Sequence, residues 1–386
     1  MKYPERFDNI RRFYDEEVAQ MLPQIRKMPE IGGILQIVLG KDYAEYLLRN
    51  LGPVNTVDDF QREVIGVLVT AIEHKTCKDV QLLGTENYDL EHGNLFVSNH
   101  RDIVLDSALL NSHLFYKGLP TTQIAIGNNL LAYPWITAAV RMNKAFVVKR
   151  DGSVKEQFII SKELSEYIRM VRTEYKESIW IAQREGRAKN SDDRTAPAII
   201  KMLTMSGARD MAASLEELNI TPLSINYEFD PCDYLKAREF QLKRDVPDYK
   251  KSQQEDLLNM KTGIMGYKGR VVFVIGKPLS NLKAVCGDAP RNEQAELIAE
   301  ALDKEIFKGY HLFPINYVAA DMLEGGTRFA CNYTAADVKA FEKYIASRIE
   351  LIDIPGKDEA FLKGKILEMY GNPALNQDKI GDAVNR

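Results

Sequence analysis

The sequence is poor in cysteine and in long apolar runs, and both absences restrict what the protein can be. Its four cysteines, Cys77, Cys232, Cys286 and Cys331, lie far apart and form no CxxC pair. This spacing indicates neither a zinc site nor a disulfide framework, so we expect a reducing compartment. No run of about eighteen consecutive apolar residues occurs, which argues against a membrane-spanning helix.

Charge and composition further restrict the class of protein to which the chain can belong. The 386 residues carry a formal net charge of −4, with 45% apolar and 27% charged residues, which is ordinary for a soluble globular protein of one or two domains. No basic face with interleaved aromatic residues occurs, so nucleic acid is not an expected partner. The first residues lack the apolar centre of a signal peptide, and we therefore expect a cytoplasmic protein, free or attached to a membrane surface.

Helical periodicity dominates both ends of the chain, and short apolar segments alternate with helices between them. Strands are predicted at 80–83, 95–98, 122–126, 145–148, 178–181, 221–225 and 271–275. Helices are predicted at 106–114, 154–174, 196–218, 292–307 and 335–350. The highly charged stretch at 243–262 is expected to be an inserted, solvated connection that contains a helix.

This alternation predicts an α/β fold with a mixed, mostly parallel sheet covered by helices. We expect three parts: a helical amino-terminal region at 1–79, an α/β domain at 80–285 and a mainly helical region at 286–386. Packing is the default role of the two helical regions.

One apolar run, residues 95–98, leads into Asn99 and His100 and is followed by Asp102 and Asp106. The run is typical of a short buried strand, and the polar residues after it are typical of a helix start. His100 is therefore expected at a strand-to-helix junction, where its side chain can face a cleft. A nearby carboxylate can fix the imidazole tautomer and offset the charge of the protonated ring. The structural alternative is an ordinary hydrogen-bonded pair at a helix end, and a metal site at these residues has no second ligand cluster to support it.

Two later strand ends carry clusters of cations, one after the strand at 145–148 and the other after the strand at 178–181. The cationic side chains are Lys149, Arg150, Arg184, Arg187 and Lys189. Guanidinium donors match phosphate oxygens in pairs, so this set suits a phosphate group. The structural alternative is a solvated loop whose charge is balanced by Asp192 and Asp193.

The apolar and aromatic stretch at 130–142 is expected to pack in the core. Alternatively, it lines an acyl channel or touches a bilayer surface. The segment at 221–228, which contains Pro222, by itself predicts only a strand.

In this order and spacing, the segments between about 80 and 280 resemble the glycerolipid acyltransferase superfamily, which includes glycerol-3-phosphate and 1-acylglycerol-3-phosphate acyltransferases. The first block of that superfamily is matched by Asn99, His100 and Asp106. The residues that match the later blocks are Phe146, Val147, Arg150, Glu185, Gly186, Arg187 and Pro222. His100 and Asp106 enclose five residues where the superfamily has four, which keeps Asp102 as an alternative carboxylate. The block around Arg187 is also irregular.

The resemblance implies direct transfer of a fatty acyl group from acyl-CoA or acyl-acyl-carrier protein to a hydroxyl of glycerol 3-phosphate or lysophosphatidate, in phospholipid biosynthesis. His100 is the implied general base, and Asp106 holds its tautomer. The residues implied to bind or shape the site of the acceptor phosphate are Arg150, Arg184, Glu185, Gly186, Arg187 and Lys189. No metal or bound cofactor is implied. Because donor and product are amphipathic, we expect a peripheral protein at the cytoplasmic face of a membrane.

Two alternatives stay open at this point. A phosphate-free lysolipid could be the acceptor, since it would use the same histidine and carboxylate without a phosphate clamp. A non-catalytic module that binds acyl thioesters or lipids would keep the fold without the chemistry, and the unusual spacing of His100 and Asp106 favours it.

Overall fold

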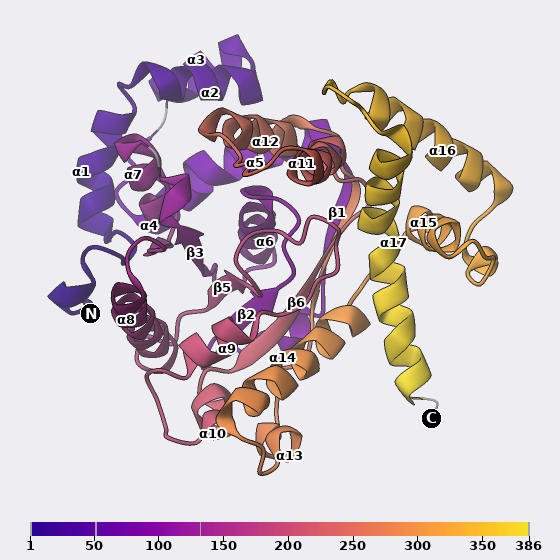
Figure 1. Ribbon diagram of the computed structural model, residues 1–386. Helices are drawn as coiled ribbons and strands as arrows, with labels where there is room; N and C mark the ends of the chain where they lie inside the picture. Colours follow the sequence, from indigo (N-terminus) through magenta and orange to yellow (C-terminus); the bar gives the residue numbers. More distant parts are fainter. Residues whose placement is uncertain (1, 51, 132, 385–386) are drawn as a thin grey trace.

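A computed structural model describes residues 2–50, 52–131 and 133–384, and in it seven strands form one sheet (Figure 1). The strands are β1 Cys77–Leu83, β2 Leu95–Ser98, β3 Gln123–Gly127, β4 Ala145–Val148, β5 Ile179–Ala182, β6 Ile220–Tyr227 and β7 Gly269–Ile275. Their order in the sheet is β1-β7-β6-β2-β5-β3-β4. The β6–β7 pair is antiparallel and the other neighbouring pairs are parallel. The predicted α/β fold with a mixed, mostly parallel sheet is confirmed.

The direction of the strands decides where a site can form. The five strands β6, β2, β5, β3 and β4 run the same way, with β2 at the centre of the sheet. Their carboxyl ends therefore meet at one edge, where parallel sheets bind ligands. Each of the seven predicted strands overlaps an observed strand. The segments predicted to carry the histidine and the cations consequently start from this common edge.

Helices cover both faces of the sheet. Side chains of β2 alternate between two buried clusters, with Leu95 and Val97 in one cluster and Phe96 in the other. The first cluster includes side chains from α8 Val154–Thr173, α9 Pro197–Leu203, α10 Met211–Glu216, α13 Leu282–Cys286 and α14 Arg291–Lys308. The second includes side chains from α5 Val67–Thr76 and α6 Leu105–Tyr116. The result is a sheet buried between two helical layers.

The amino-terminal region is helical, as predicted. Its helices are α1 Asp15–Ile25, α2 Pro29–Leu39, α3 Lys41–Asn50 and α4 Val57–Phe60, and the π-helix Gln61–Gly66 leads into α5. Side chains of α1 and α4 share a buried cluster with Ala138 and Met142 of α7 Pro134–Met142. Part of the apolar stretch predicted at 130–142 therefore packs in the interior, while Ala132 within it lies outside the described residues.

The carboxyl-terminal helices pack against β7 and against a helix from the middle of the chain. These helices are α15 Pro314–Glu324, α16 Ala335–Glu350 and α17 Glu359–Val384. They share a buried cluster with Ala237 of α11 Asp233–Asp245 and with Val272 of β7. The predicted domain limits near residues 79 and 285 stay predictions. None of the described helices combines the length and the apolarity needed to cross a bilayer.

The predicted helix at 196–218 is wrong as a single element, because α9 and α10 are separate. A Cβ atom on Gly207 would lie 2.4 Å from the Ser214 hydroxyl and 2.3 Å from Nη2 of Arg169, so another residue type would require these two side chains to shift. The carboxylate of Asp210 then accepts a hydrogen bond from the Ala213 N–H at 2.9 Å and starts α10.

The stretch at 243–262 contains a helix, as predicted, but it is not a merely solvated connection. It holds the end of α11 and most of α12 Gln253–Met265. Asn259 and Gly263 are buried on the inner side of α12. This helix closes one side of the candidate active site.

Candidate active site

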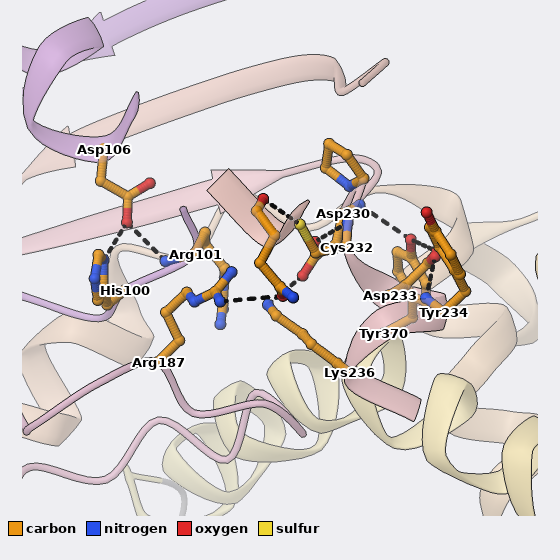
Figure 2. Close-up of polar contacts among 12 residues, drawn as sticks. His100, Arg101, Asp106, Arg187, Asp230, Cys232, Asp233, Tyr234, Lys236 and Tyr370 are labelled. Carbon is orange, nitrogen blue, oxygen red and sulfur yellow. Dashed lines mark hydrogen bonds and ion pairs between the residues drawn. The ribbon is translucent and has the colours of Figure 1, made fainter. Parts of the chain in front are cut away.

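His100 and Asp106 form a hydrogen-bonded pair just beyond the carboxyl end of β2 (Figure 2). Nδ1 of His100 lies 2.8 Å from Oδ2 of Asp106. The His100 side chain is 14% exposed, whereas Asp106 is fully buried. The same carboxylate oxygen accepts a hydrogen bond from the backbone N–H of Arg101 at 2.7 Å. With Nδ1 directed at a carboxylate, Nε2 is the ring nitrogen left to exchange a proton with a ligand.

Asp102, the alternative carboxylate, is occupied elsewhere. Its Oδ1 accepts hydrogen bonds from the backbone N–H groups of Val104 at 2.9 Å and Leu105 at 2.8 Å, which caps the start of α6. A Cβ atom on Gly263 would lie 2.0 Å from Oδ2 of Asp102, so only glycine lets α12 approach this closely. Burial, and then the charge of Asp106, raise the pKa of Asp102. The geometry thus assigns Asp106 to His100, and the turn before α6 absorbs the extra residue of the spacing.

The strand ends around His100 are held by side-chain amide and hydroxyl groups. Asn99 donates from Nδ2 to the carbonyl of Ile225 at 2.9 Å and accepts from its N–H at 2.8 Å, which extends the pairing of β2 with β6. The Trp180 ring meets the His100 ring edge-on, with centroids 5.7 Å apart. Trp180 donates from Nε1 to the Ser98 hydroxyl at 3.0 Å. The His100 imidazole therefore packs against an indole ring whose position is fixed by a hydrogen bond.

A cavity of about 220 Å³ opens beside the His100–Asp106 dyad. His100 lines it together with apolar side chains and with cations. The main apolar lining residues are Ile103, Ile124, Ile126, Leu130 and Trp180. The cationic lining residues are Arg150, Arg184, Arg187, Lys189 and Lys251, against the single acidic lining residue Asp256. One cavity thus combines a base, an apolar wall and an excess of positive charge.

The structure brings five of the six predicted phosphate-site residues to this cavity. Arg150, Arg184, Gly186, Arg187 and Lys189 line it, and Glu185 is exposed and pairs with Nη1 of Arg150 at 3.2 Å. Gly186 has a φ of +66°, in the left-handed region that favours glycine, and so turns the loop. Lys189 is ion-paired with Glu239, and burial lowers the pKa of Lys189. These cations are therefore not equally free to bind an anion.

Arg187 carries a buried guanidinium nitrogen that has no partner within the described ranges of the chain. Its Nη1 is buried and has no hydrogen-bond partner among the described residues, while Nη2 lies 3.5 Å from Oδ1 of Asn259. Figure 2 shows Arg187 between the dyad and the buried ion pair of Asp230 with Lys236. A buried donor without a partner is costly unless a ligand supplies one. Arg187 is consequently the strongest candidate for binding an anionic group.

A buried ion pair that sequence reasoning missed joins the dyad to the cationic loop. Arg101 donates from Nη1 to Oδ1 of Asp193 at 2.9 Å and from Nη2 to Oδ2 at 2.6 Å. Tyr310, at the end of α14, donates its hydroxyl to Oδ2 of Asp193 at 2.5 Å. From the sequence alone, Asp193 is expected only to balance the charge of a solvated loop. Because Arg101 and Asp193 are ninety-two residues apart, no local sequence pattern predicts their ion pair.

Two further lining residues are Lys251, just before α12, and Asp256, in the first turn of α12. They form an ion pair with Nζ 2.6 Å from Oδ1. Their charge was expected in a solvated connection, and no spacing rule links them to His100. In the described part of the chain, no group of three or more His, Cys, Asp or Glu side chains is placed to hold a metal ion.

A larger hollow, of about 460 Å³, lies at the opposite edge of the sheet. Its charges are largely paired within the protein, with Arg12 2.9 Å from Glu177 and Lys144 3.1 Å from Asp58. It contains no histidine. The chemistry of the cavity beside His100 is therefore the better guide to function.

The far end of the cationic loop makes the stability of the fold depend on pH. Asp303 accepts hydrogen bonds at Oδ1 from the backbone N–H and the hydroxyl of Thr195, at 2.8 and 2.6 Å. Burial nevertheless raises the pKa of Asp303 from 3.8 to about 6. The folded protein then holds this proton more tightly than the unfolded chain, so the free energy of unfolding falls as the pH rises from about 4 to about 6.

Asp303→Asn is expected to remove this fall, because an amide oxygen can still accept both hydrogen bonds from Thr195 and carries no charge. Above pH 6 the variant should be more stable than the wild type by about 1–3 kcal/mol, and near pH 4 the advantage should vanish. Urea unfolding across this pH range measures the difference. Parallel stability curves for the two proteins would contradict the expectation.

Residues 75–226 match the family model described as Acyltransferase. A solved structure, the 1-acyl-sn-glycerophosphate (LPA) acyltransferase PlsC from Thermotoga maritima, resembles the chain with 12% sequence identity and a TM-score of 0.36, over 75% of this chain and 97% of that chain. No curated protein sequence matches.

The matched segment includes β1 to β5, the dyad and all the predicted cations. The superfamily resemblance predicted from the sequence is therefore confirmed over this segment. Residues 75–226 of the chain are therefore similar to the acyltransferase family.

Proposed function

We propose that the protein transfers a fatty acyl group from an acyl thioester to a hydroxyl of glycerol 3-phosphate or lysophosphatidate. The observation that carries the proposal is the placement of His100, paired with Asp106, in the wall of a cavity that five cations also line. A general base, an apolar wall and an anion site in one cavity are what a phosphorylated acceptor and a fatty acyl donor need. The donor is acyl-CoA or acyl-acyl-carrier protein.

The proposed reaction is direct transfer. Nε2 of His100 takes the proton of the acceptor hydroxyl while the oxygen attacks the thioester carbonyl carbon. The carbon–sulfur bond then breaks, and the imidazolium returns the proton to the departing thiolate. Asp106 holds the imidazole in the required tautomer and offsets the positive charge that forms on it. Because the cavity positions the hydroxyl, part of the entropy cost of bringing the two substrates together is met by binding.

Arg187→Ala should raise KM for a phosphorylated acceptor about 10- to 100-fold, because the variant loses a charge-assisted hydrogen bond to the phosphate. The change in kcat should be small, since the base stays in place. Steady-state kinetics with the acceptor concentration varied measure both constants.

Arg194→Ala is the matched control for Arg187→Ala. Arg194 belongs to the same loop, but its guanidinium lies over the Phe307 ring at 5.3 Å and pairs with Asp192 at 3.4 Å. It does not line the cavity. Equal effects of the two substitutions on KM would argue against a phosphate contact by Arg187.

A phosphate-free lysolipid is the second candidate acceptor. The pairing of Arg150 with Glu185 and of Lys189 with Glu239 favours it, because these two cations are already partly neutralised. The two candidates differ in one consequence: Arg187→Ala should leave KM for a phosphate-free acceptor unchanged.

A labelled transfer assay tests the function directly. The purified protein is offered radiolabelled acyl-CoA or acyl-acyl-carrier protein, together with glycerol 3-phosphate, lysophosphatidate or a phosphate-free lysolipid. Movement of label into one acceptor identifies the reaction and the donor. Thioester binding without transfer to any acceptor would instead favour a non-catalytic binding module.

We also propose that the enzyme acts as a peripheral protein at the cytoplasmic face of a membrane, because its substrates are amphipathic. Exposed apolar side chains such as Ile37 of α2, Tyr133 before α7 and Phe158 of α8 support this placement. Co-sedimentation with anionic vesicles tests it. A protein that stays in the supernatant at low salt would contradict it.

A further inference from the structure

Only one of the two oxygens of the Asp106 carboxylate, which orients His100, accepts hydrogen bonds in the described part of the chain. Oδ2 of Asp106 accepts hydrogen bonds from Nδ1 of His100 and from the Arg101 N–H. Oδ1 is buried and has no hydrogen-bond partner among the described residues. A buried carboxylate oxygen without a donor is costly, and the carboxylate is then held through only one of its two oxygens. A donor for Oδ1 would therefore fix the geometry of the dyad.

The hydroxyl of Tyr227 is the complementary group. Tyr227 is the last residue of β6, the neighbour of β2, so it reaches the same edge of the sheet as His100. Its hydroxyl is also buried without a hydrogen-bond partner in the described part of the chain. Burial, and then the negative charge of Asp106, raise the pKa of Tyr227 well above its ordinary value. The phenol consequently keeps its proton near neutral pH and can act as a donor.

We propose that Tyr227 is a positioning residue that donates a hydrogen bond to Oδ1 of Asp106 and so completes a row of three side chains, Tyr227, Asp106 and His100. This inference rests on the proposed function in that His100 is the base. Tyr227 touches no substrate. Its hydrogen bond holds the carboxylate in the plane that Nδ1 of His100 requires and draws part of the negative charge away from Oδ2.

The surroundings leave few other groups that could produce the same effect. The other titratable groups that act on Tyr227 are Asp102 and Cys77. Asp102 already accepts two backbone hydrogen bonds from α6, and burial raises the pKa of the Cys77 thiol, which therefore stays neutral. Arg101 reaches Asp106 through its backbone N–H, since its guanidinium is engaged by Asp193.

Tyr227→Phe separates positioning from packing. The substitution keeps the buried ring and removes only the hydroxyl with its one proposed hydrogen bond, so the melting temperature should fall by no more than a few degrees. The value of kcat should fall about tenfold, with KM nearly unchanged, because the base is less well held. The acid limb of the kcat/KM profile should move to higher pH, since more negative charge then faces the imidazole.

Two controls make the measurement specific. Tyr88→Phe also removes a buried hydroxyl, one that donates to the Pro120 carbonyl at 2.9 Å at the opposite edge of the sheet, and it should leave the pH profile unchanged. In an Asp106→Asn background, Tyr227→Phe should have little further effect on kcat, because the group it positions has already been altered.

A readout independent of activity distinguishes failure of this inference from failure of the proposed function. NMR of histidine-labelled protein, with the His100 signal assigned through His100→Gln, follows the titration midpoint of the ring in the wild type and in Tyr227→Phe. A higher midpoint in the variant, in a protein that transfers no acyl group, would leave the inference standing and refute the function. Active wild type with an unchanged midpoint, rate and pH profile in Tyr227→Phe would overturn the inference.

Discussion

Replacing His100 with alanine is expected to lower the rate of acyl transfer roughly 10²- to 10⁴-fold, the usual loss when a positioned general base is removed. The ring is 14% exposed at the cavity wall, whereas its carboxylate partner is fully buried, so Asp106 is not placed to take over the proton transfer from Nε2. Thioester binding should change little, because the apolar wall and the cations remain. Steady-state kcat/KM and the dissociation constant of the thioester measure the two effects separately.

The chain offers a matched control for this substitution. His113, on α6, forms a similar pair with Glu73, with Nε2 3.1 Å from the carboxylate, and its side chain is 16% exposed. It does not line the cavity beside His100. His113→Ala should therefore retain nearly full activity. If both histidine variants keep full transfer activity, His100 is not the base and its pairing with Asp106 is structural.

Local patterns in the sequence were enough to place His100 but not to choose its partner. A short apolar run followed by polar residues predicts a strand end and a helix start, and the structure has β2 and α6 there. Asp102 and Asp106 could not be separated by spacing, because both were expected on one face of a helix. In the structure α6 begins only at Leu105, so Asp102 lies in the preceding turn and caps the helix.

The rest of the site depends on contacts between segments that are distant in the chain. Lys251 and Asp256 reach the cavity because α12 packs against the domain with its buried residues Asn259 and Gly263. The high average charge of this stretch gives no sign in the sequence that one face of the helix is buried. The sequence around Tyr227 predicts only a strand, because no sequence pattern indicates that Tyr227 lies near Asp106. The strands were predictable because their apolar periodicity is local.

The ion pair between Arg101 and Asp193 should have the largest effect on stability. Asp193→Ala is expected to lower the free energy of unfolding by about 3–5 kcal/mol, because it leaves the buried guanidinium of Arg101 without its counter-charge. The Tyr310 hydroxyl loses its acceptor in the same step. Urea unfolding, followed by tryptophan fluorescence and circular dichroism, measures the loss.

Asp192→Ala is the control, because Asp192 is the adjacent residue, is 46% exposed and pairs with Arg194 at 3.4 Å, so its loss should cost at most about 1 kcal/mol. Equal stability of the two variants would mean that the Arg101 guanidinium finds water or another partner. Where Asp193→Ala is still folded, its activity should also fall. Asp193 holds the loop that carries Arg187, and Arg101 donates its backbone N–H to Asp106, so one ion pair positions both the anion site and the base.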